Sequence, residues 1–361
     1  MKTARVTRVG LRAWRFCSAG LPHPLQPPFP LPETRWMASS SPEQQDQLIA
    51  QAMGQAGESD AQRIRSITEL GNLLGNTRGS LTSPKGLMCL IDLVQREEKP
   101  RIVTHAIGAL GRLQALSAVM ILIDAALGLN LRVYEGDAGA AFLQTDEALR
   151  LRCAAVQALG KIQDERAVIP LMSILNDRAL NYRLRMSAAE SLGRAGNPHA
   201  LNSLMDILQD DRESSVYLRE STAKALGMLG DIRAIDSLLD LLEAKRGVRD
   251  KFIFLKEQAI EALGRLSRRS GDKRRVTDSL VRSLRDSAAS IRLAAVEALA
   301  DTDDPRFVPN VGELLRDSDE EVALAAVSAV FRLGGEAAIR EWIESDNLPQ
   351  YVRDEMETYI P

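Results

Sequence analysis

The sequence predicts an all-α protein in which short antiparallel helix pairs stack into a solenoid. One phrase recurs between Leu151 and Phe331: an aliphatic residue, usually a cation, then small residues and Ala-Leu-Gly or a near copy. The copies begin at Leu151, Leu184, Leu218, Leu255, Ile291 and Val322. Steps of 31 to 37 residues are typical of stacked helical pairs. Aromatic residues make up only 4% of the chain, which favours closely packed small helices over a sheet core.

Each phrase predicts the first helix of a pair, because apolar and small residues recur three and four positions apart. The stretch from 167 to 175 keeps this period and predicts a second, shorter helix. The phrases end in glycines that we expect to close the first helix in a left-handed cap: Gly160, Gly193, Gly227 and Gly264. Acidic residues follow that we expect to cap the second helix: Asp164, Asp231, Asp272 and Asp303.

About seven to eight repeats are expected over residues 43–345. The first is a degenerate repeat with an entry helix over 43–75, and a further copy begins at Ile102. The step from Ile102 to Leu151 is 49 residues, which predicts an insertion near residues 128–147. This Gly-rich stretch is either a functional loop or a neutral one. Apolar residues over 346–361 predict a C-terminal capping helix that closes the stack.

Residues 1–42 are predicted to be a disordered, basic and Pro-rich leader outside the fold. Its first 36 residues hold a single acid, Glu33, and six cations: Lys2, Arg5, Arg8, Arg12, Arg15 and Arg35. Subtracting this net +5 from the chain's −3 leaves about −8 for the remainder. An organelle-targeting peptide and a translated upstream leader are both open, since the sequence from Met37 resembles an ordinary protein start.

Several classes of chemistry have no support in the sequence. Three widely spaced cysteines and three isolated histidines favour neither a metal site nor a disulfide framework, and a reducing, cytoplasmic location is expected. No run reaches the roughly 18 to 20 apolar residues that span a bilayer. The basic stretch 265–275 lies in a net-acidic body without interleaved aromatic residues, so no nucleic-acid partner is expected.

The repeated phrase resembles the HEAT-like repeat of phycobilisome lyases. The resemblance rests on Leu-Arg-x-x-Ala-x-x-Ala-Leu-Gly with a following Asp and Arg-Ala-(Val/Ile), as in 158–168 and 225–235, and covers about residues 60–345. It implies a solenoid whose phrase-bearing helices line the concave surface. Members of that family attach or detach bilins on phycobiliproteins, and others simply hold partners, so the fold does not decide the function.

The resemblance also implies a row of variable residues on the concave surface. The full row is Arg101, Thr104 and His105; Arg150, Cys153 and Gln157; Tyr182, Arg183, Met186 and Glu190; Tyr217, Glu220 and Lys224; Phe254, Glu257 and Glu261; and Glu297. Its stretch from Arg150 to Glu261, without Cys153 and Gln157, is the candidate partner-binding surface. The frame cations Arg152, Arg185, Arg219, Lys256 and Arg292 are expected instead to pair with turn acids of neighbouring repeats.

Two features of the row favour an interface. Tyr182, Tyr217 and Phe254 occupy nearly the same frame position in consecutive copies, and aromatic residues with Met and Arg are favoured at protein interfaces. The glutamates form an acidic ladder that suits a basic or amphipathic partner. The alternative is that the aromatic residues fill gaps between helices and the glutamates form a solvated face stabilised by Arg183 and Lys224.

The sequence therefore predicts a non-enzymatic scaffold or adaptor that holds a protein partner on its concave face, without a cofactor. The alternative is a bilin lyase subunit or chaperone that acts on a phycobiliprotein, alone or with a second HEAT-like subunit. In that case a bilin is bound transiently, and Cys153 is the concave thiol that could hold it. His105 is the one concave histidine, for which a surface role is expected over a catalytic one.

Overall fold

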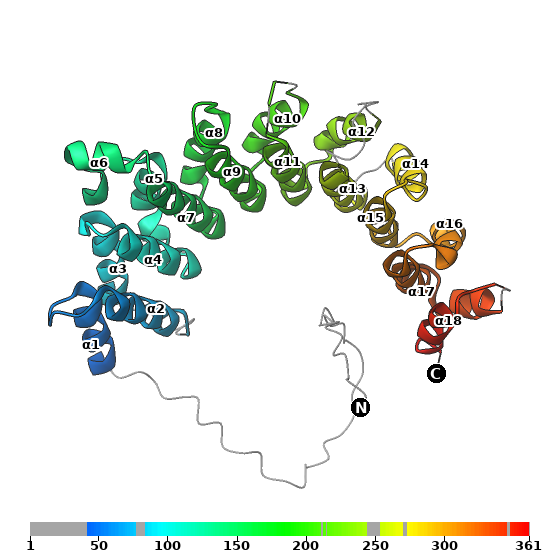
Figure 1. Ribbon diagram of the computed structural model, residues 1–361, viewed down its shortest axis with the longest axis horizontal. Coiled ribbons are helices and arrows are strands. Elements are labelled where there is room, and N and C mark those ends of the chain that lie inside the picture. Colours follow the sequence, from blue (N-terminus) through cyan, green and yellow to red (C-terminus); the bar gives the residue numbers. More distant parts are fainter. Residues whose placement is uncertain are drawn as a thin grey trace, which may run out of the picture. The chain divides into compact units, whose positions relative to one another are not determined.

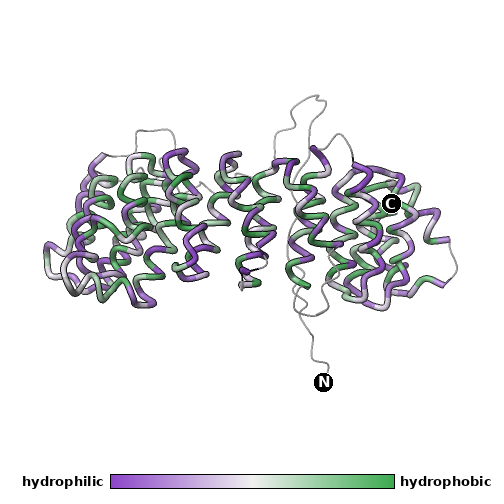
Figure 2. The backbone as a smooth tube through the Cα atoms, turned by 90° about the horizontal axis from the view of Figure 1, so that it is seen from above, coloured by the Kyte–Doolittle hydropathy of each residue, from purple (hydrophilic) through white to green (hydrophobic). Residues whose placement is uncertain are grey.

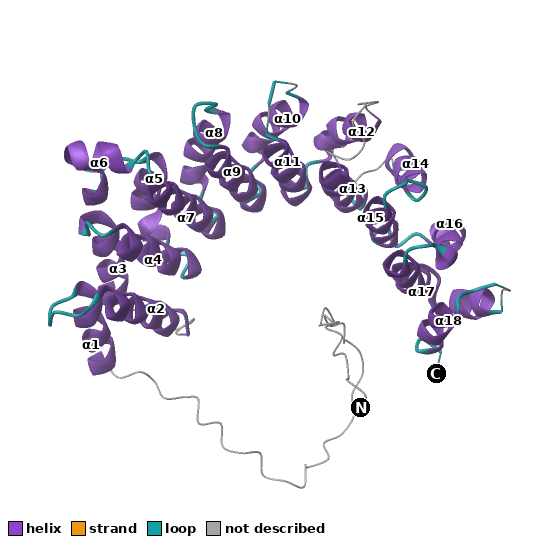
Figure 3. Cartoon of the chain, in the orientation of Figure 1, coloured by secondary structure: helices purple, strands orange, loops and turns teal. Residues whose placement is uncertain are grey.

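The computed structural model describes residues 42–76, 84–210, 212–213, 215–243, 253–269, 273–344 and 347–360. All regular secondary structure in these ranges is helical (Figure 3), which confirms the predicted all-α class. The chain divides into two units, Met1–Ser40 and Ser41–Pro361. The predicted leader lies outside the described residues, except that Pro42 already begins the first helix.

Within the second unit, helices alternate between an inner and an outer row of a curved array (Figure 1). The inner helices are α2 (Asp60–Asn76), α4 (Pro100–Arg112), α7 (Asp146–Ile162), α9 (Tyr182–Ala195), α11 (Val216–Leu229), α13 (Ile253–Ser267), α15 (Ala289–Ala300) and α17 (Glu320–Ile343). The outer helices are α1 (Pro42–Met53), α3 (Pro84–Arg96), α5 (Val119–Leu127), α8 (Val168–Asn176), α10 (Leu201–Gln209), α12 (Ile235–Glu243), α14 (Arg274–Ser283) and α16 (Val308–Gly312). Gly335, with φ 67°, divides α17 into the two members of a last pair.

The helices form because each has a narrow apolar stripe to bury. In α7, Leu151, Ala155 and Leu159 are at most 1% exposed, and fully burying one leucine contributes about 1.5–3 kcal/mol. Figure 2 shows hydrophobic and hydrophilic residues interleaved along every helix. Each inner helix from α4 to α15 buries three sides, against the inner helices before and after it and against its outer helix. Its fourth side lines the concave face.

The prediction that the phrase glycines are left-handed caps is wrong. They lie inside the inner helices, where the next inner helix passes closest. A Cβ on Gly193 would lie 2.6 Å from the Cα of Ala225, so only glycine allows this approach. The left-handed residues come three positions later: Gln163 (φ 60°), Gly196 (φ 69°) and Gly230 (φ 75°).

Acidic residues cap short 3₁₀ segments that lead into the outer helices. Asp164 and Asp231 do so as predicted, and each carboxylate accepts from the backbone N–H two residues later. Asp303 does not, because its φ of 54° places it in the left-handed turn, and Asp304 caps instead. Asp272 lies outside the described residues. The segments capped by an acid are η3 (Glu165–Ala167), η5 (Ile232–Ala234) and η6 (Pro305–Phe307). The equivalent η4 (Pro198–Ala200) is capped by Asn197, and η1 (Leu116–Ala118) has no side-chain cap.

The frame cations connect consecutive helix pairs. Arg185 donates from Nε to the Leu175 carbonyl at the end of α8, 2.9 Å away, and pairs with Glu213 after α10 at 2.8 Å. The predicted pairing with an acid is also confirmed for Lys256 with Asp286 (3.7 Å) and Arg292 with Asp317 (2.6 Å). Arg152 and Arg219 donate to the backbone carbonyls of Ala126 and Leu208, which end the preceding outer helices.

The predicted insertion is folded over its described part. It contains η2 (Arg132–Tyr134) and α6 (Gly136–Phe142). The Tyr134 hydroxyl donates to the Ala125 carbonyl of α5 at 3.0 Å, and the Tyr134 ring stacks on Phe142 at 6.1 Å. These contacts hold the segment against the array as a structural element.

At the C-terminal end of the array, α18 (Gln350–Glu357) packs on α17. Val352 and Met356 are fully buried there. The rings of Phe331 and Tyr359 lie 4.7 Å apart, and Ser328 and Tyr359 share a hydrogen bond of 3.2 Å. The apolar surface of the last pair is thereby covered.

Two described segments, Leu116–Tyr134 and Glu320–Ile343, are long and apolar enough to cross a membrane by length and composition. Half of each is buried inside the array. The first is divided among η1, α5 and η2, and the second is broken at Gly335. Core helices of a stacked array have the same composition, so these segments are weak evidence for a span.

Candidate concave interaction site

The candidate residues lie on the inner helices, and the three aromatic residues come from the first turns of consecutive ones. Tyr182 begins α9, and Tyr217 and Phe254 are second in α11 and α13. Their exposed fractions are 38%, 61% and 68%. Solvent exposure of this size in three neighbouring repeats places a row of apolar rings along the N-terminal ends of the inner helices.

Two of these rings contact each other. The Tyr182 and Tyr217 centroids are 6.2 Å apart with planes 26° from parallel, so the rings stack across the α9–α11 boundary. The Arg183 guanidinium lies 6.0 Å from the Tyr182 ring centroid. The gap-filling alternative therefore describes part of the geometry, but both tyrosines keep a solvent-facing side on which a partner can pack.

Acidic residues lie deeper on the same helices. Burial raises the pKa of Glu220, and the Glu257 carboxylate of the next inner helix adds to this shift by repulsion. One carboxylate oxygen of Glu257, Oε1, is buried without a hydrogen-bond partner among the described residues. Glu261 lies 3.4 Å from Arg265. Among the described residues, neither of these half-buried carboxylates on adjacent helices, Glu220 and Glu257, forms an ion pair with a cation.

The remaining candidate residues border this centre. Met186 and Glu190 are half-buried on α9, whereas Lys224 on α11 and Arg150 on α7 are exposed. Glu297 continues the acidic row on α15. The structure therefore places every residue of the candidate set on the inner row between α7 and α13.

Sequence reasoning named Arg101, Arg150 and Arg183 one by one, but it missed that they belong to a basic region of the same surface. Its exposed cations are Arg101 and Arg112 on α4, Arg150 and Lys161 on α7, and Arg183 and Arg194 on α9. They stand one position before and ten positions after the aliphatic residue that opens each copy. Aligning the copies at these two positions would have found them.

The concave thiol and histidine have structural surroundings. Burial raises the pKa of Cys153, which keeps it in the less reactive thiol form. His105 shares a 2.8 Å hydrogen bond between Nδ1 and the Arg101 carbonyl of its own helix. Among the described residues no group of His, Cys, Asp and Glu side chains could hold a metal ion.

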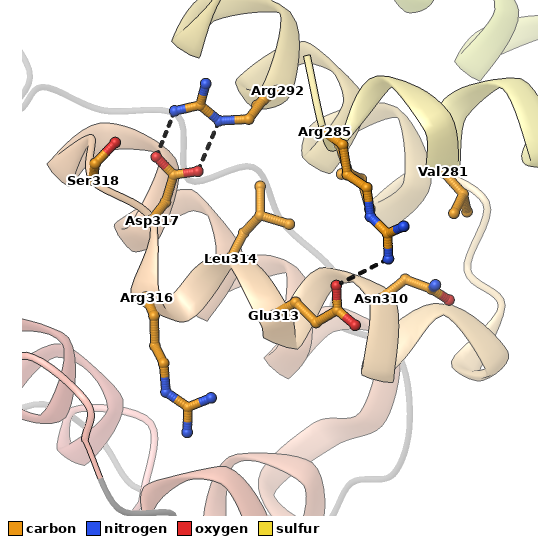
Figure 4. A pocket seen from close by; sticks show the side chains of 10 residues that line it. Val281, Arg285, Arg292, Asn310, Glu313, Leu314, Arg316, Asp317 and Ser318 are labelled. Carbon is orange, nitrogen blue, oxygen red and sulfur yellow. Dashed lines mark hydrogen bonds and ion pairs between the residues drawn. The ribbon is translucent and has the colours of Figure 1, made fainter. Parts of the chain in front are cut away.

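A polar pocket of about 390 Å³ opens on the other side of the array, between α14 and α16 (Figure 4). Ion pairs cross its lining: Arg292 holds Asp317 through two nitrogens, and Arg285 lies 3.5 Å from Glu313. Both pairs join neighbouring repeats, so these charges stabilise the stack. The basic stretch 265–275 also bridges repeats, through Arg268 with Asp301 and Arg275 with Asp236.

The fold and the exposed inner row define an α-solenoid built from helical-pair repeats. Four stretches match the family model for HEAT repeats, residues 140–216, 180–254, 248–331 and 277–355. These stretches cover more than half of the chain, which therefore belongs to the HEAT-repeat family. The matching model is the general one for HEAT repeats and not one for phycobilisome lyases. A search of curated proteins found no match.

Solved structures are similar to this chain at low sequence identity, and the two with a TM-score above 0.5 share its fold. A chain of the Kap95:Nup1 complex is 13% identical with a TM-score of 0.55, over 87% of this chain and 46% of that one. Importin beta in an ammonium sulfate condition is 15% identical with a TM-score of 0.54, over 88% and 46%. The complex of CpcE and CpcF of phycocyanin lyase from Nostoc sp. PCC7120 is 24% identical with a TM-score of 0.40, over 61% and 92%.

Proposed function

We propose that this protein is a non-enzymatic scaffold that holds a protein partner on its concave face, centred on α9, α11 and α13. One observation carries the proposal: the exposed, stacked Tyr182–Tyr217 pair lies next to the half-buried Glu220–Glu257 pair. Exposed aromatic rings are favoured anchors at interfaces. Burial, and then repulsion from Glu257, raise the pKa of Glu220, and a cation from a partner would offset both effects. The partner expected at this centre is basic or amphipathic.

The bilin-presenting alternative would need a concave group that holds the pigment. Cys153 is the expected group, and the burial that raises its pKa disfavours the thiolate needed for a covalent bond. The scaffold role is therefore favoured over the bilin-presenting role. Mixing the purified chain with a bilin separates the two roles, because a shifted visible absorption band is expected only for a pigment carrier.

Affinity capture tests the scaffold. The tagged full chain and the variant Tyr182→Ala/Tyr217→Ala are used to capture proteins from the cells that make the protein. Losing two interface aromatic residues should reduce recovery of the true partner at least about tenfold, since each anchor contributes about 1–2 kcal/mol or more. Helicity should be unchanged because both rings are exposed.

The matched control is Met120→Ala/Ile169→Ala. These side chains are 56% and 78% exposed on the outer helices α5 and α8. The control variant should capture the same proteins as the wild type. Equal recovery by the tyrosine variant and the wild type would place the interface elsewhere.

A further inference from the structure

We infer that the concave face takes its partner segment in one direction, with acidic residues over α4 and α7 and basic residues over α13 and α15. The inference rests on the proposed function and adds the order of charges along the partner. It follows from the way exposed charges are separated along the inner row, which the acidic ladder alone did not reveal.

The first half of the row is basic. Each of α4 and α7 presents two exposed cations at the concave frame positions, and α9 presents Arg183 and Arg194 against Glu190. The following cations form no ion pair with a residue that the structure describes: Arg101, Arg112, Arg150, Lys161 and Arg194. Asp60 interacts electrostatically with Arg101, and Asp146 with Arg183. Neither is within ion-pair distance of these arginines, so the cations remain available to a partner.

The second half of the row is acidic. Its acids stand two, six or ten positions after the aliphatic residue that opens each copy. On α11 Glu220 is balanced by Lys224, α13 presents Glu257 and Glu261 against Arg265, and α15 presents Glu297 and Asp301. Arg265 pairs with Glu261, and both Arg268 and Arg332 pair with Asp301. Glu220 and Glu257 have no such partner among the described residues, and Glu257 keeps a buried unpartnered oxygen. The charge thus changes sign between α9 and α13.

The aromatic pair marks the point where the sign changes. Tyr182 belongs to the last basic helix, and Tyr217 to the balanced helix that follows it. Neighbouring helices pack about 8–10 Å apart, so the five steps from α4 to α15 span about 45 Å. An extended segment of about 14 residues covers this length at about 3.3 Å per residue. The fitting segment is acidic at one end, apolar in the middle and basic at the other.

The partner segment should bind in one orientation, because a reversed segment would place like charges together at both of its ends. This repulsion should reduce the affinity several-fold over the basic half of the row and again over the acidic half. A nucleic acid fits only the basic half, since its phosphates would meet Glu220 and Glu257 in the other. The charge order therefore favours a protein segment of mixed charge over a polyanion.

The test uses two fluorescent peptides of about 15 residues with one composition. In the bipolar peptide, Glu residues fill the first third, Leu and Trp the middle and Lys residues the last third. In the control, the Glu and Lys residues alternate. The bipolar peptide should bind the full chain at least about tenfold more tightly at low salt. A photo-crosslinker at its Glu end should label α4 or α7, and one at its Lys end should label α13 or α15.

Charge reversal gives the second readout. Arg150→Glu/Arg183→Glu and Glu257→Lys/Glu261→Lys should each weaken binding of the bipolar peptide. Combining all four should invert the crosslinks while the helical content stays unchanged. Equal binding of the two peptides, crosslinks without direction, or tighter binding of a 15-nucleotide single-stranded DNA would overturn the inference. If these results occurred while partner capture still depended on Tyr182 and Tyr217, the docking site would stand and only its direction would fall.

Discussion

At the residue scale, the closest contacts between repeats are made by glycines whose role the sequence pattern concealed. Gly193 faces the backbone of Ala225, whereas Gly108 on α4 meets only the distal nitrogen of Arg112, 3.6 Å from a Cβ at that position. The two glycines share a helical backbone but differ in the space around them. Their substitution therefore separates close packing from helix propensity.

We expect Gly193→Ala to lower the free energy of unfolding by about 1–3 kcal/mol, because the added methyl must push α9 from α11. Gly108→Ala is the matched control and should raise it by about 0.5–1 kcal/mol, through the helix propensity of alanine. Urea unfolding followed by circular dichroism measures both values. Equal effects of the two substitutions would show that the glycines serve only the helix backbone.

A second prediction concerns Glu220, whose folded pKa lies above its unfolded value. The ionised carboxylate therefore destabilises the fold above the folded pKa, and this destabilisation disappears as the pH falls below about 4.3, the unfolded value. Glu220→Gln mimics the protonated group, so it should raise the melting temperature at pH 7 and lose this advantage near pH 4. Thermal melts at both pH values measure it. Asp240→Asn, at an exposed position on α12, should show no such gain.

At the element scale, the stack depends on side chains that cross from one helix pair to the next. Arg185 and Glu213 are only 4% and 6% exposed, and the Arg185 Nη2 atom has no further partner among the described residues. Their ion pair joins α9 to the loop after α10. A buried pair of this kind is costly to break, because the remaining charge stays out of water.

Glu213→Gln should therefore lower the free energy of unfolding by about 3 kcal/mol. Arg282 and Glu243 provide the comparison, because they form an exposed ion pair of similar length. Their nitrogen–oxygen distance is 3.0 Å, against 2.8 Å for Arg185 and Glu213. Glu243→Gln should cost less than about 1 kcal/mol, because water already solvates both partners. Chemical denaturation of the two variants checks the difference, and similar costs would contradict the role given to burial.

The inner helices were predictable because apolar spacing and the recurring phrase both mark them. The contacts between helices were not, since Gly160 and Gly193 have the same local sequence signal whether they end a helix or admit a neighbour. The Tyr182–Tyr217 stack and the basic region around Arg150 also depend on how adjacent repeats align in space. The candidate row lay on the expected helices, but its charge order became clear only in the folded array.

At the scale of the whole molecule, each repeat contacts only its neighbours, so damage should stay local. Val352 is fully buried between α18 and α17. Val352→Asp should release α18 and the end of α17 to hydrogen exchange, because a buried unpaired charge is costly. Amide protection in α4 to α9 should be unchanged, as measured by mass spectrometry. Loss of protection throughout the array would show a single cooperative unit instead.

The central claim is that a protein partner occupies the concave face between α9 and α13. Hydroxyl-radical footprinting of the complex tests it most directly, because aromatic and sulfur side chains react readily and report their own exposure. Binding should protect Tyr182, Met186, Tyr217 and Phe254 and leave Met120 and Ile169 on the outer helices reactive. Protection of the outer residues with the inner ones unchanged would contradict the account.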